Sequence, residues 1–345
     1  MSHFVKVPLP LNISPDETGL YGPYQSYPFP VQKIKLLKHV FITHSGFCIN
    51  KDGLIKECHH DYKRHYDSYL AEASLYYRSA VTDPDNLITL DDDTTYLLIH
   101  HPWYNYYHWM CESIFRLWMA RRKLDRVTLI LPRFYWDADF ITGSLAPFGL
   151  KNIFFIPSTR CLYVKNLCLP QIKPLCDSYN GLHVRQVRQL YRDYIFKHSK
   201  PGADKVERLY ISRKLAGRRR VINEEEIETI LCRFGFTIFY PENHPFLGQV
   251  AIFAQVRWLV GEHGSGLTNL LFMEKGSSVL ELHKDRTNEL DHPSFLFWYM
   301  AEALGINYYH QSCAAYGKED YYEGDYIVEP ALFEKNIRRL LAQST

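Results

Sequence analysis

The stretch RWLVGEHGSGLTN, residues 257–269, decides the fold of the second half of the chain. Its first part, Trp258–Val260, is a short apolar run that is typical of a buried strand. Gly264 and Gly266 allow a tight turn, and the residues after them begin a helix. A strand, a glycine turn and a helix in this order indicate an α/β sheet whose parallel strands are covered by helices on both faces.

The same alternation extends in both directions. Strands are predicted at 34–55 (more than one), 96–99, 127–132, 152–157, 208–213, 237–240, 277–282 and 306–310. Helices are predicted, in part or whole, at 60–83, 105–122, 137–149, 181–198, 222–235, 244–256, 295–305 and 330–342. Asn223 is expected to cap the helix 222–235, and Gly235 to end it. Cys111 and Cys232 are expected to lie in helices as core residues.

Two α/β units joined by a linker at 198–205 predict two Rossmann-like domains that face a cleft. We expect residues 91–200 to form the N-terminal domain and 201–325 the C-terminal one. Residues 1–90 are expected to form an N-terminal arm, irregular and β-rich, because six of the 18 prolines lie in the first 30 residues. Residues 326–345 are expected to form a C-terminal helix.

The composition of the 345 residues excludes several classes of protein. With 46% hydrophobic and 23% charged residues, the chain is globular rather than disordered. The 40 Lys and Arg against 38 Asp and Glu exclude a protein that coats nucleic acid through its overall charge. Eight cysteines without a CxxC pair favour a reducing compartment and no zinc ribbon. The first residues lack a signal-peptide pattern, so we expect a cytoplasmic protein, with peripheral contact to the inner membrane face allowed.

The segment NYYHWMCE, residues 105–112, is the first candidate site. Asn105 is a predicted helix cap, and the i,i+4 spacing of His108 and Glu112 places both on one helix face, where either is a candidate general base. In the alternative, Glu112 pairs with Arg116, and His108 caps the helix or packs. A zinc site would need a third ligand, which we do not expect the sequence to offer. Aromatic residues make up 15% of the chain, and they are expected either to fill the core or to form surfaces on which sugars stack. Several of them lie in or beside this segment: Tyr104, Tyr106, Tyr107 and Trp109.

The turn His263–Asn269 is the second candidate site. Glycines let the backbone approach a ligand, and N–H groups at a helix start favour phosphate. Asn269 stands where a dinucleotide fingerprint has its third glycine, which argues against an oxidoreductase. The alternative is a purely structural strand-to-helix turn.

The remaining candidate site residues are basic and acidic residues near the ends of other predicted strands. Arg213 and Arg218 follow the strand 208–213, where an α/β sheet binds ligands, or they belong to a solvated run neutralised by Glu224–Glu226. Glu281 could accept ribose hydroxyls, or it is an exposed strand-end residue. Asp91–Asp93 is expected to be an acidic turn rather than a metal-binding Asp-x-Asp motif.

Together these blocks resemble glycosyltransferase family 61. The resemblance rests on NYYHWMCE, YISR with its arginine cluster, EEEI, FGF followed by PE, QVAIFAQVRWLVGEHGSGLTNLLFM and GSSVLEL, and it covers about residues 95–285. The turn GEHGSGLTN is its most specific part, with Ser265 where the family usually has Ala. The family includes transferases of bacterial capsule and lipopolysaccharide synthesis, of plant xylan side chains and of O-linked N-acetylglucosamine.

The resemblance implies a GT-B-like fold and an inverting glycosyltransferase that needs no metal and no other cofactor. It implies a sugar donor linked to a nucleotide, expected to be UDP, and a glycan or lipid-linked glycan acceptor in bacterial surface polysaccharide synthesis. The transferred sugar would be a hexose, a pentose or an N-acetylhexosamine. His108 and Glu112 would then be catalytic, with either one as the base. The alternative is a catalytically inactive nucleotide- or glycan-binding protein of the same fold.

The resemblance also sorts the remaining candidates by substrate. The acceptor would contact the first segment, at Asn105, Tyr106, Tyr107 and Trp109. The nucleotide-sugar would contact Arg213, Arg218, His263, Gly264, Ser265, Gly266, Leu267, Thr268, Asn269 and Glu281. For Glu281 and Asn269, support of the turn is the other expected role.

Overall fold

The computed structural model describes residues 2–173, 175–198, 206–284, 292–317 and 323–342. The chain divides into two compact units. Unit 1 contains Met1–His3 and Pro30–Cys176, and unit 2 contains Phe4–Phe29 and Asp177–Thr345. The predicted linker 198–205 lies, apart from His198, outside the described residues. The division into four segments with bounds at 90, 200 and 325 stays a prediction.

Unit 1 is built on a seven-stranded mixed sheet with the strand order β5-β4-β3-β9-β6-β7-β8. The strands are β3 (Ile34–Thr43), β4 (Cys48–Asn50), β5 (Gly53–Leu54), β6 (Leu87–Leu98), β7 (Val127–Pro132), β8 (Ile153–Ile156) and β9 (Cys161–Pro170). Strands β9, β6, β7 and β8 run parallel, whereas β3 pairs antiparallel with β9. The predicted strands β6, β7 and β8 pair in parallel as expected, and β9, which we did not predict, joins them to the antiparallel strands of the sheet.

Strand β6 also corrects the expectation for Asp91–Asp93. These residues lie within the strand rather than in a turn, at a register shift between Leu90 and Thr95. A bulge tolerates exposed polar side chains because it interrupts the ladder locally. Asp93 pairs with Lys165 on the surface, 2.8 Å away.

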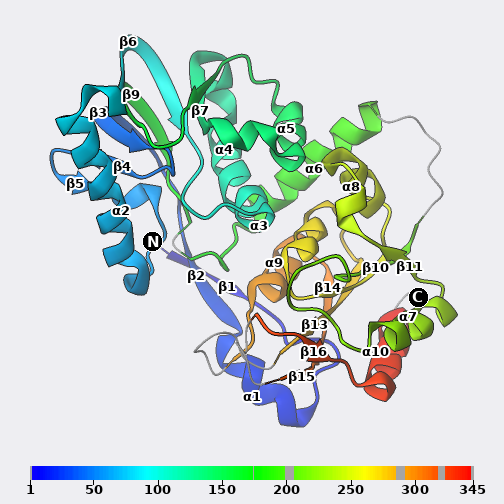
Figure 1. The fold of residues 1–345 in the computed structure, drawn as a ribbon. Helices are drawn as coiled ribbons and strands as arrows, with labels where there is room; N and C mark the ends of the chain where they lie inside the picture. The colour runs from blue at the N-terminus through cyan, green and yellow to red at the C-terminus, as the bar shows by residue number, and fades with distance from the viewer. Residues whose placement is uncertain (1, 174, 199–205, 285–291, 318–322, 343–345) are drawn as a thin grey trace. The chain divides into compact units, whose positions relative to one another are not determined.

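Helices cover both faces of the unit 1 sheet. The helical elements are η3 (Lys56–Cys58), α2 (Lys63–Thr82), η4 (Pro84–Asn86), α3 (Tyr106–His108), the π-helix η5 (Trp109–Ser113), α4 (Ile114–Ala120), η6 (Arg121–Arg126), η7 (Arg133–Asp137), α5 (Asp139–Leu145) and η8 (Ala146–Phe148). Helix α2 packs on β3 and β9, and α4 packs on β9 (Figure 1). Alternate residues of β6 serve the two faces: Leu98 joins the core under α2, and Leu97, pointing the other way, is also buried.

Unit 2 contains a five-stranded parallel sheet in the order β11-β10-β12-β13-β14. The strands are β10 (Arg208–Ile211), β11 (Thr237–Phe239), β12 (Trp258–Glu262), β13 (Ser278–His283) and β14 (Asn307–Ser312). Numbered along the chain from β10, this is the order 2-1-3-4-5 of a doubly wound sheet, which reverses between β10 and β12. At such a reversal, loops diverge from the carboxyl ends of the strands and leave a place for a ligand.

The helices of unit 2 agree with the predicted segments. They are α6 (Gly181–His198), α7 (Glu224–Arg233), η9 (Pro241–Asn243), α8 (Phe246–Phe253), η10 (Ser265–Phe272), α9 (Leu296–Leu304) and α10 (Pro330–Ala342), with a small sheet of β15 (Ala314–Ala315) and β16 (Tyr326–Ile327). Residues of α7 and α10 share one core with Val260 and Leu280. Helices α6, α8 and α9 pack together apart from that core (Figure 1).

Two details of α7 differ from the predictions. Asn223 stands at the N-cap, but its side chain does not cap the helix. Its amide instead exchanges hydrogen bonds with the backbone of Val328. Cys232 is exposed, because it falls on the outer face of α7, whereas Cys111 is buried as expected.

The first 30 residues of the predicted N-terminal arm form a segment that is only partly irregular. It contains β1 (Ser2–Lys6), η1 (Pro15–Glu17), α1 (Thr18–Tyr21), η2 (Gly22–Tyr24) and β2 (Ser26–Pro30). Most of it belongs to unit 2, where Asn12 bonds to the backbone of His310 and Tyr21 bonds to His283. The arm is thus tied to unit 2 by buried polar contacts.

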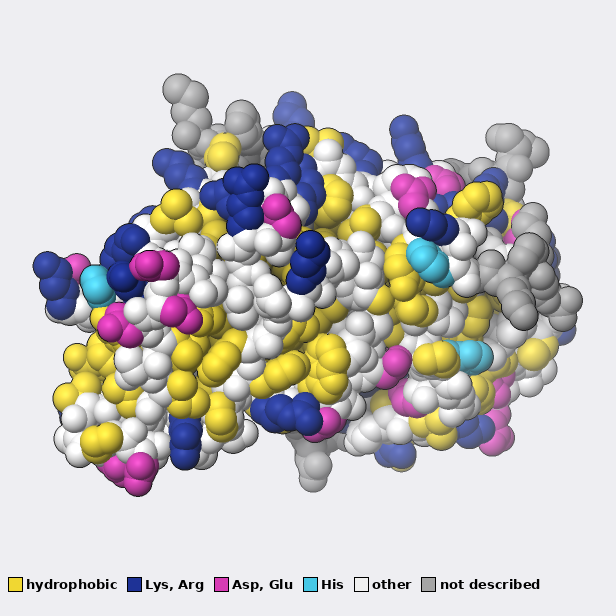
Figure 2. Space-filling model, turned by 90° about the horizontal axis from the view of Figure 1, so that it is seen from above, with side chains coloured by type: hydrophobic (Ala, Val, Ile, Leu, Met, Phe, Trp, Pro, Cys, Tyr) yellow, Lys and Arg dark blue, Asp and Glu magenta, His cyan; other side chains and the backbone are white. Residues whose placement is uncertain are grey.

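The surface carries charges of both signs. On the face drawn in Figure 2, Lys and Arg side chains alternate with Asp, Glu and hydrophobic ones. Among the described residues, we find no helix that combines the length and apolar character needed to cross a bilayer.

Candidate active site

The helical start at residues 105–113 positions the first site, in unit 1. The Asn105 side chain accepts the backbone N–H of His108 at 3.0 Å, which confirms the predicted cap. The helix then widens into the π-helical turn Trp109–Ser113. Such turns are rare and occur often at functional sites. At this π-helical turn, Nδ1 of His108 lies 2.8 Å from Oε2 of Glu112, so the two side chains are in contact, as their spacing predicts.

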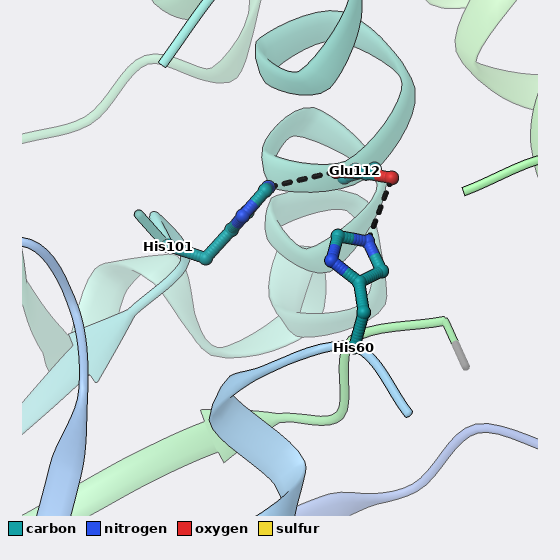
Figure 3. Close-up of side chains that lie close together, drawn as sticks. All are labelled: His60, His101 and Glu112. Carbon is teal, nitrogen blue, oxygen red and sulfur yellow. Dashed lines mark hydrogen bonds and ion pairs between the residues drawn. The ribbon is translucent and has the colours of Figure 1, made fainter. Parts of the chain in front are cut away.

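Glu112 is the centre of a buried cluster that the sequence did not reveal. Nε2 of His60 lies 2.9 Å from Oε1 of Glu112, and Nε2 of His101 lies 2.8 Å from Oε2 (Figure 3). Nζ of Lys173 lies 3.8 Å from Oε1. The Glu112 side chain is 0% exposed, whereas the His108 side chain is 15% exposed. His108 is therefore the member of the cluster that a substrate could reach.

The charges in this cluster follow from burial and proximity. Burial lowers the pKa of His101 to about 3 and also lowers the pKa of His60, so both rings are neutral near pH 7. Burial alone would raise the pKa of Glu112, but the neighbouring histidines outweigh it and hold that pKa well below its ordinary value. The site is a buried carboxylate anion surrounded by N–H donors.

The hydrogen bonds assign the tautomers. Since Glu112 is ionised and only accepts, Nδ1 of His108 carries a proton, so Nε2 is the ring nitrogen on which a basic lone pair can lie. Nδ1 of His101 accepts the backbone N–H of Trp103 at 3.4 Å, so the His101 proton lies on Nε2, facing Glu112.

The cluster contains additional groups that could bind zinc, so the expectation that a third ligand is missing was wrong. The fold brings His60 and His101 to Glu112, and their ligand atoms lie within 4.8 Å of one another. These groups fit a cation poorly, however. His101 points a proton, not a lone pair, at the site, and the ammonium group of Lys173 already offsets the carboxylate. The absence of a metal stays a prediction. It now rests on the chemistry of these groups and no longer on the number of available ligands.

The other residues of the segment are placed differently from the expectation. Arg116 does not serve as the hydrogen-bond partner of Glu112: its buried guanidinium donates to the carbonyls of Ile99, His100 and Pro170. Tyr107 and Trp109 are buried, and the indole N–H donates to Ser144. A buried ring offers no face to a sugar, so the geometry does not support these two as acceptor contacts.

Exposed aromatic rings lie elsewhere in the same region. Tyr104, Phe134 and Trp136 are each about 40% exposed, and Tyr104 lies 5.4 Å from Phe134 between ring centroids. Tyr106 is half-buried and Asn105 exposed. The sequence did not single out Phe134 or Trp136, although their segment RFYWD follows β7 directly.

The second site lies in unit 2, where the strand order reverses between β10 and β12. Arg213 follows β10, and the turn His263–Asn269 follows β12. The Arg213 guanidinium donates to the carbonyls of Arg218 and Arg219 at 3.0 and 3.2 Å. A Cβ on Gly264 would lie 2.5 Å from Nη1 of Arg213, so any larger residue here would force the guanidinium to shift. The fold thus brings two predicted donor-site elements together.

The His263 ring is held by a buried carboxylate. Nδ1 of His263 lies 2.6 Å from Oε1 of Glu281, and the Tyr308 hydroxyl donates to Oε2 at 2.6 Å. Glu281 is buried, not an exposed strand-end residue. Its position matches the alternative expectation, support of the turn. Asn269 is also buried and donates to Gln249.

The remaining candidates of this site are placed as follows. Leu267 and Thr268 are buried, whereas Ser265 and Gly266 are half-buried in η10. Arg218 is more than half exposed and pairs with Glu323 at 2.9 Å, while Arg220 pairs with Asp325. The arginine run is therefore neutralised chiefly by Glu323 and Asp325 rather than by Glu224–Glu226.

A further buried carboxyl group lies beneath Arg213. Glu262 accepts the Tyr210 hydroxyl at 3.1 Å, and Nε of Arg213 lies 3.6 Å from its other oxygen. Burial raises the pKa of Glu262 to about 8, despite the opposing effect of Arg213. The group is therefore largely protonated near neutral pH.

Two comparisons with known proteins bear on the family of the chain. The chain is 34% identical over 205 residues to the EGF domain-specific O-linked N-acetylglucosamine transferase of Drosophila melanogaster. That match covers 52% of this chain and 39% of the relative, so the chain spans well under two thirds of that protein. The family Glycosyltransferase 61 matches residues 106–280, about half of the chain, a range that includes His108, Glu112 and His263. The chain belongs to the glycosyltransferase 61 family.

Proposed function

We propose that this protein transfers a sugar from a nucleotide-sugar to a hydroxyl group, with inversion at the anomeric carbon. The observation that carries the proposal is the His108–Glu112 pair. An ionised, buried carboxylate holds the Nδ1–H of a partly exposed histidine, which presents Nε2 as a base. The family membership supports the same class of reaction.

The reaction needs one displacement. The acceptor oxygen forms a bond to the anomeric carbon while its proton passes to Nε2 of His108. The bond from that carbon to the phosphate oxygen breaks, and its electron pair leaves with the nucleoside diphosphate. Glu112 keeps the imidazole in the required tautomer and stabilises the imidazolium that forms. Attack on the face opposite the leaving group gives inversion.

The leaving diphosphate needs positive charge and N–H donors. We assign these to Arg213, Arg218, His263 and the backbone of 264–269, because the reversal of the unit 2 sheet places their loops at one strand edge. Mononucleotide sites of doubly wound sheets lie at such an edge. A GT-B-like arrangement of the two units is part of this proposal.

The donor and the acceptor are proposed from different arguments. A UDP-linked sugar follows from the family resemblance, and the name of the Drosophila relative makes UDP-N-acetylglucosamine the first donor to test. The same name makes a hydroxyl of an EGF domain the first acceptor to test, beside the glycans of bacterial surface polysaccharides. Tyr104, Phe134 and Trp136 are the exposed rings suited to an acceptor sugar.

The test is a thermal-shift panel of nucleotide-sugars and nucleoside diphosphates, followed by turnover with the best donor. We expect His108→Ala and Glu112→Gln each to lower turnover by about 10²- to 10⁴-fold, with donor affinity nearly unchanged. Asp93→Asn is the matched control, because Asp93 is exposed and belongs to the Asp-x-Asp-like run. Stabilisation by no nucleotide at all would contradict the proposal. Binding without turnover by the wild type would favour the inactive module instead.

A further inference from the structure

We infer that His60 is a positioning residue of the acceptor-side base, which extends the site beyond the family-matched residues 106–280. This inference rests on the proposed function of His108 and Glu112. His60 follows η3 and lies 52 residues before Glu112, in a segment that no motif singled out. The base is then a three-residue arrangement of His60, Glu112 and His108.

Three histidines contact the carboxylate of Glu112: His60 lies on Oε1, whereas His101 and His108 lie on Oε2. His60 donates from Nε2 to Oε1 at 2.9 Å, and His108 donates from Nδ1 to Oε2 at 2.8 Å. The His60 ring stacks on Trp103, with centroids 4.5 Å apart and an interplanar angle of 26°. A ring that is 1% exposed and stacked has little freedom to turn away from Glu112.

The position of Lys173 shows why Glu112 needs this donor. Its ammonium group lies 3.8 Å from Oε1, the oxygen that His60 occupies, and bonds to the Tyr107 hydroxyl and the Cys176 carbonyl. The last torsion of a glutamate is soft. Without the His60 N–H, a full ion pair with Lys173 would draw Oε1 away, and the carboxylate would rotate off His108. His60 therefore keeps Oε2 directed at Nδ1 of His108.

Two substitutions separate the donated proton from the packing. His60→Phe keeps a ring to stack on Trp103 but has no donor, whereas His60→Gln offers an amide N–H in place of Nε2–H. His65→Phe is the matched control, because His65 also contacts Trp103, at 5.5 Å between centroids, but has no hydrogen bond to Glu112. Two readouts are compared: the His108 tautomer by long-range ¹H–¹⁵N NMR, and donor hydrolysis kinetics with UDP-N-acetylglucosamine.

We expect the Nδ1–H form of His108 in the wild type, in His60→Gln and in His65→Phe, and a mixture of tautomers in His60→Phe. In the same variant kcat should fall by about 10- to 100-fold with donor KM unchanged, and His60→Gln should recover most of the loss. An unchanged tautomer and kcat in a folded His60→Phe protein would overturn the inference. So would one bound zinc per chain, measured by plasma mass spectrometry and lost in His60→Phe, since His60 would then be a ligand.

The NMR readout keeps this inference separate from the proposed function. It needs no substrate, so a tautomer change in His60→Phe supports the positioning role even if no nucleotide-sugar is turned over. Conversely, turnover that depends on His108 but is unaffected by His60→Phe supports the proposed function and rejects the role of His60. If His60→Phe does not fold, a His60→Gln protein with wild-type tautomer and kcat supports the inference, and a folded His60→Gln protein that has lost the Nδ1–H form overturns it.

Discussion

Nδ1 of His263 lies 2.6 Å from Oε1 of the buried Glu281, the same contact that joins Nδ1 of His108 to Oε2 of Glu112 at 2.8 Å. In both pairs the histidine is partly exposed, at 13% and 15%, and the carboxylate is buried. Each unit thus contains a partly exposed histidine whose ring orientation is fixed by a contact between Nδ1 and a buried glutamate. Under the proposed function, the first pair removes a proton from the acceptor and the second faces the leaving diphosphate.

The second pair leads to a prediction for donor binding. Glu281→Gln removes the negative charge that holds His263 while keeping an oxygen for the Tyr308 hydroxyl. We expect the affinity for UDP to fall about 10-fold, because charge-assisted hydrogen bonds are the stronger ones. Isothermal titration calorimetry with UDP measures the change. Glu302→Gln, a half-buried carboxyl of α9 in the same unit, is the control. Equal UDP affinity in Glu281→Gln and the wild type would reject the role of the pair.

A methyl group at Gly264 should disturb the same site. The added Cβ would lie 2.5 Å from Nη1 of Arg213, so Gly264→Ala should displace the guanidinium and weaken UDP binding by about 10-fold, an effect of about 1.4 kcal/mol. Gly217→Ala in the neighbouring loop meets nothing within 4 Å and should have no effect. In the Arg213→Ala background, Gly264→Ala should cost little more, since the clash is gone. Additive losses in the double variant would show that Gly264 acts independently of Arg213.

The protonated Glu262 predicts how stability depends on pH. Its pKa is about 8 in the folded chain against an ordinary value of 4.5, so the unfolded chain loses this proton first as the pH rises. The stability linked to the proton is complete below about pH 4.5 and is lost as the pH rises towards 8, by an amount on the order of 5 kcal/mol. Glu262→Gln does not titrate. Its thermal unfolding midpoint should fall less between pH 5 and pH 8.5 than that of the wild type, and parallel curves would contradict the assignment.

Arg116 provides a prediction about the framework of the first site. Its buried guanidinium satisfies three carbonyls, of Ile99, His100 and Pro170, at the ends of β6 and β9. Arg116→Met leaves these acceptors without their donor and should lower the free energy of unfolding by about 3 kcal/mol. Urea denaturation of the protein, followed by tryptophan fluorescence, measures this loss. Arg126→Met, at a side chain 83% exposed, should change it by less than about 0.5 kcal/mol, and an equal effect of the two would be against the prediction.

Local patterns in the sequence predicted much of the fold. The predicted strands 127–132 and 257–261, each followed by a helical pattern, correspond to β7 and β12, because buried strands and amphipathic helices have different hydrophobic periods. The contact between His108 and Glu112 was also predictable, since helical spacing places them together regardless of the remaining chain. Strand β9 was missed: its alternation is interrupted by Lys165 and Asn166, and its pairing with β3 joins residues more than 100 positions apart.

By itself, the sequence determined the α/β class, the order of most elements, the adjacency of His108 and Glu112, and the family. Only the tertiary structure decided what surrounds them. His60 and His101 reach Glu112 from separate loops. Glu281 reaches His263 from β13, and Tyr308 reaches Glu281 from the neighbouring strand β14. Burial, which sets the charge of Glu112 and of Glu262, likewise depends on what packs around each carboxyl group. The reason is physical: spacing along a helix is local, whereas contacts across a sheet and the desolvation of a charge arise only when distant segments pack.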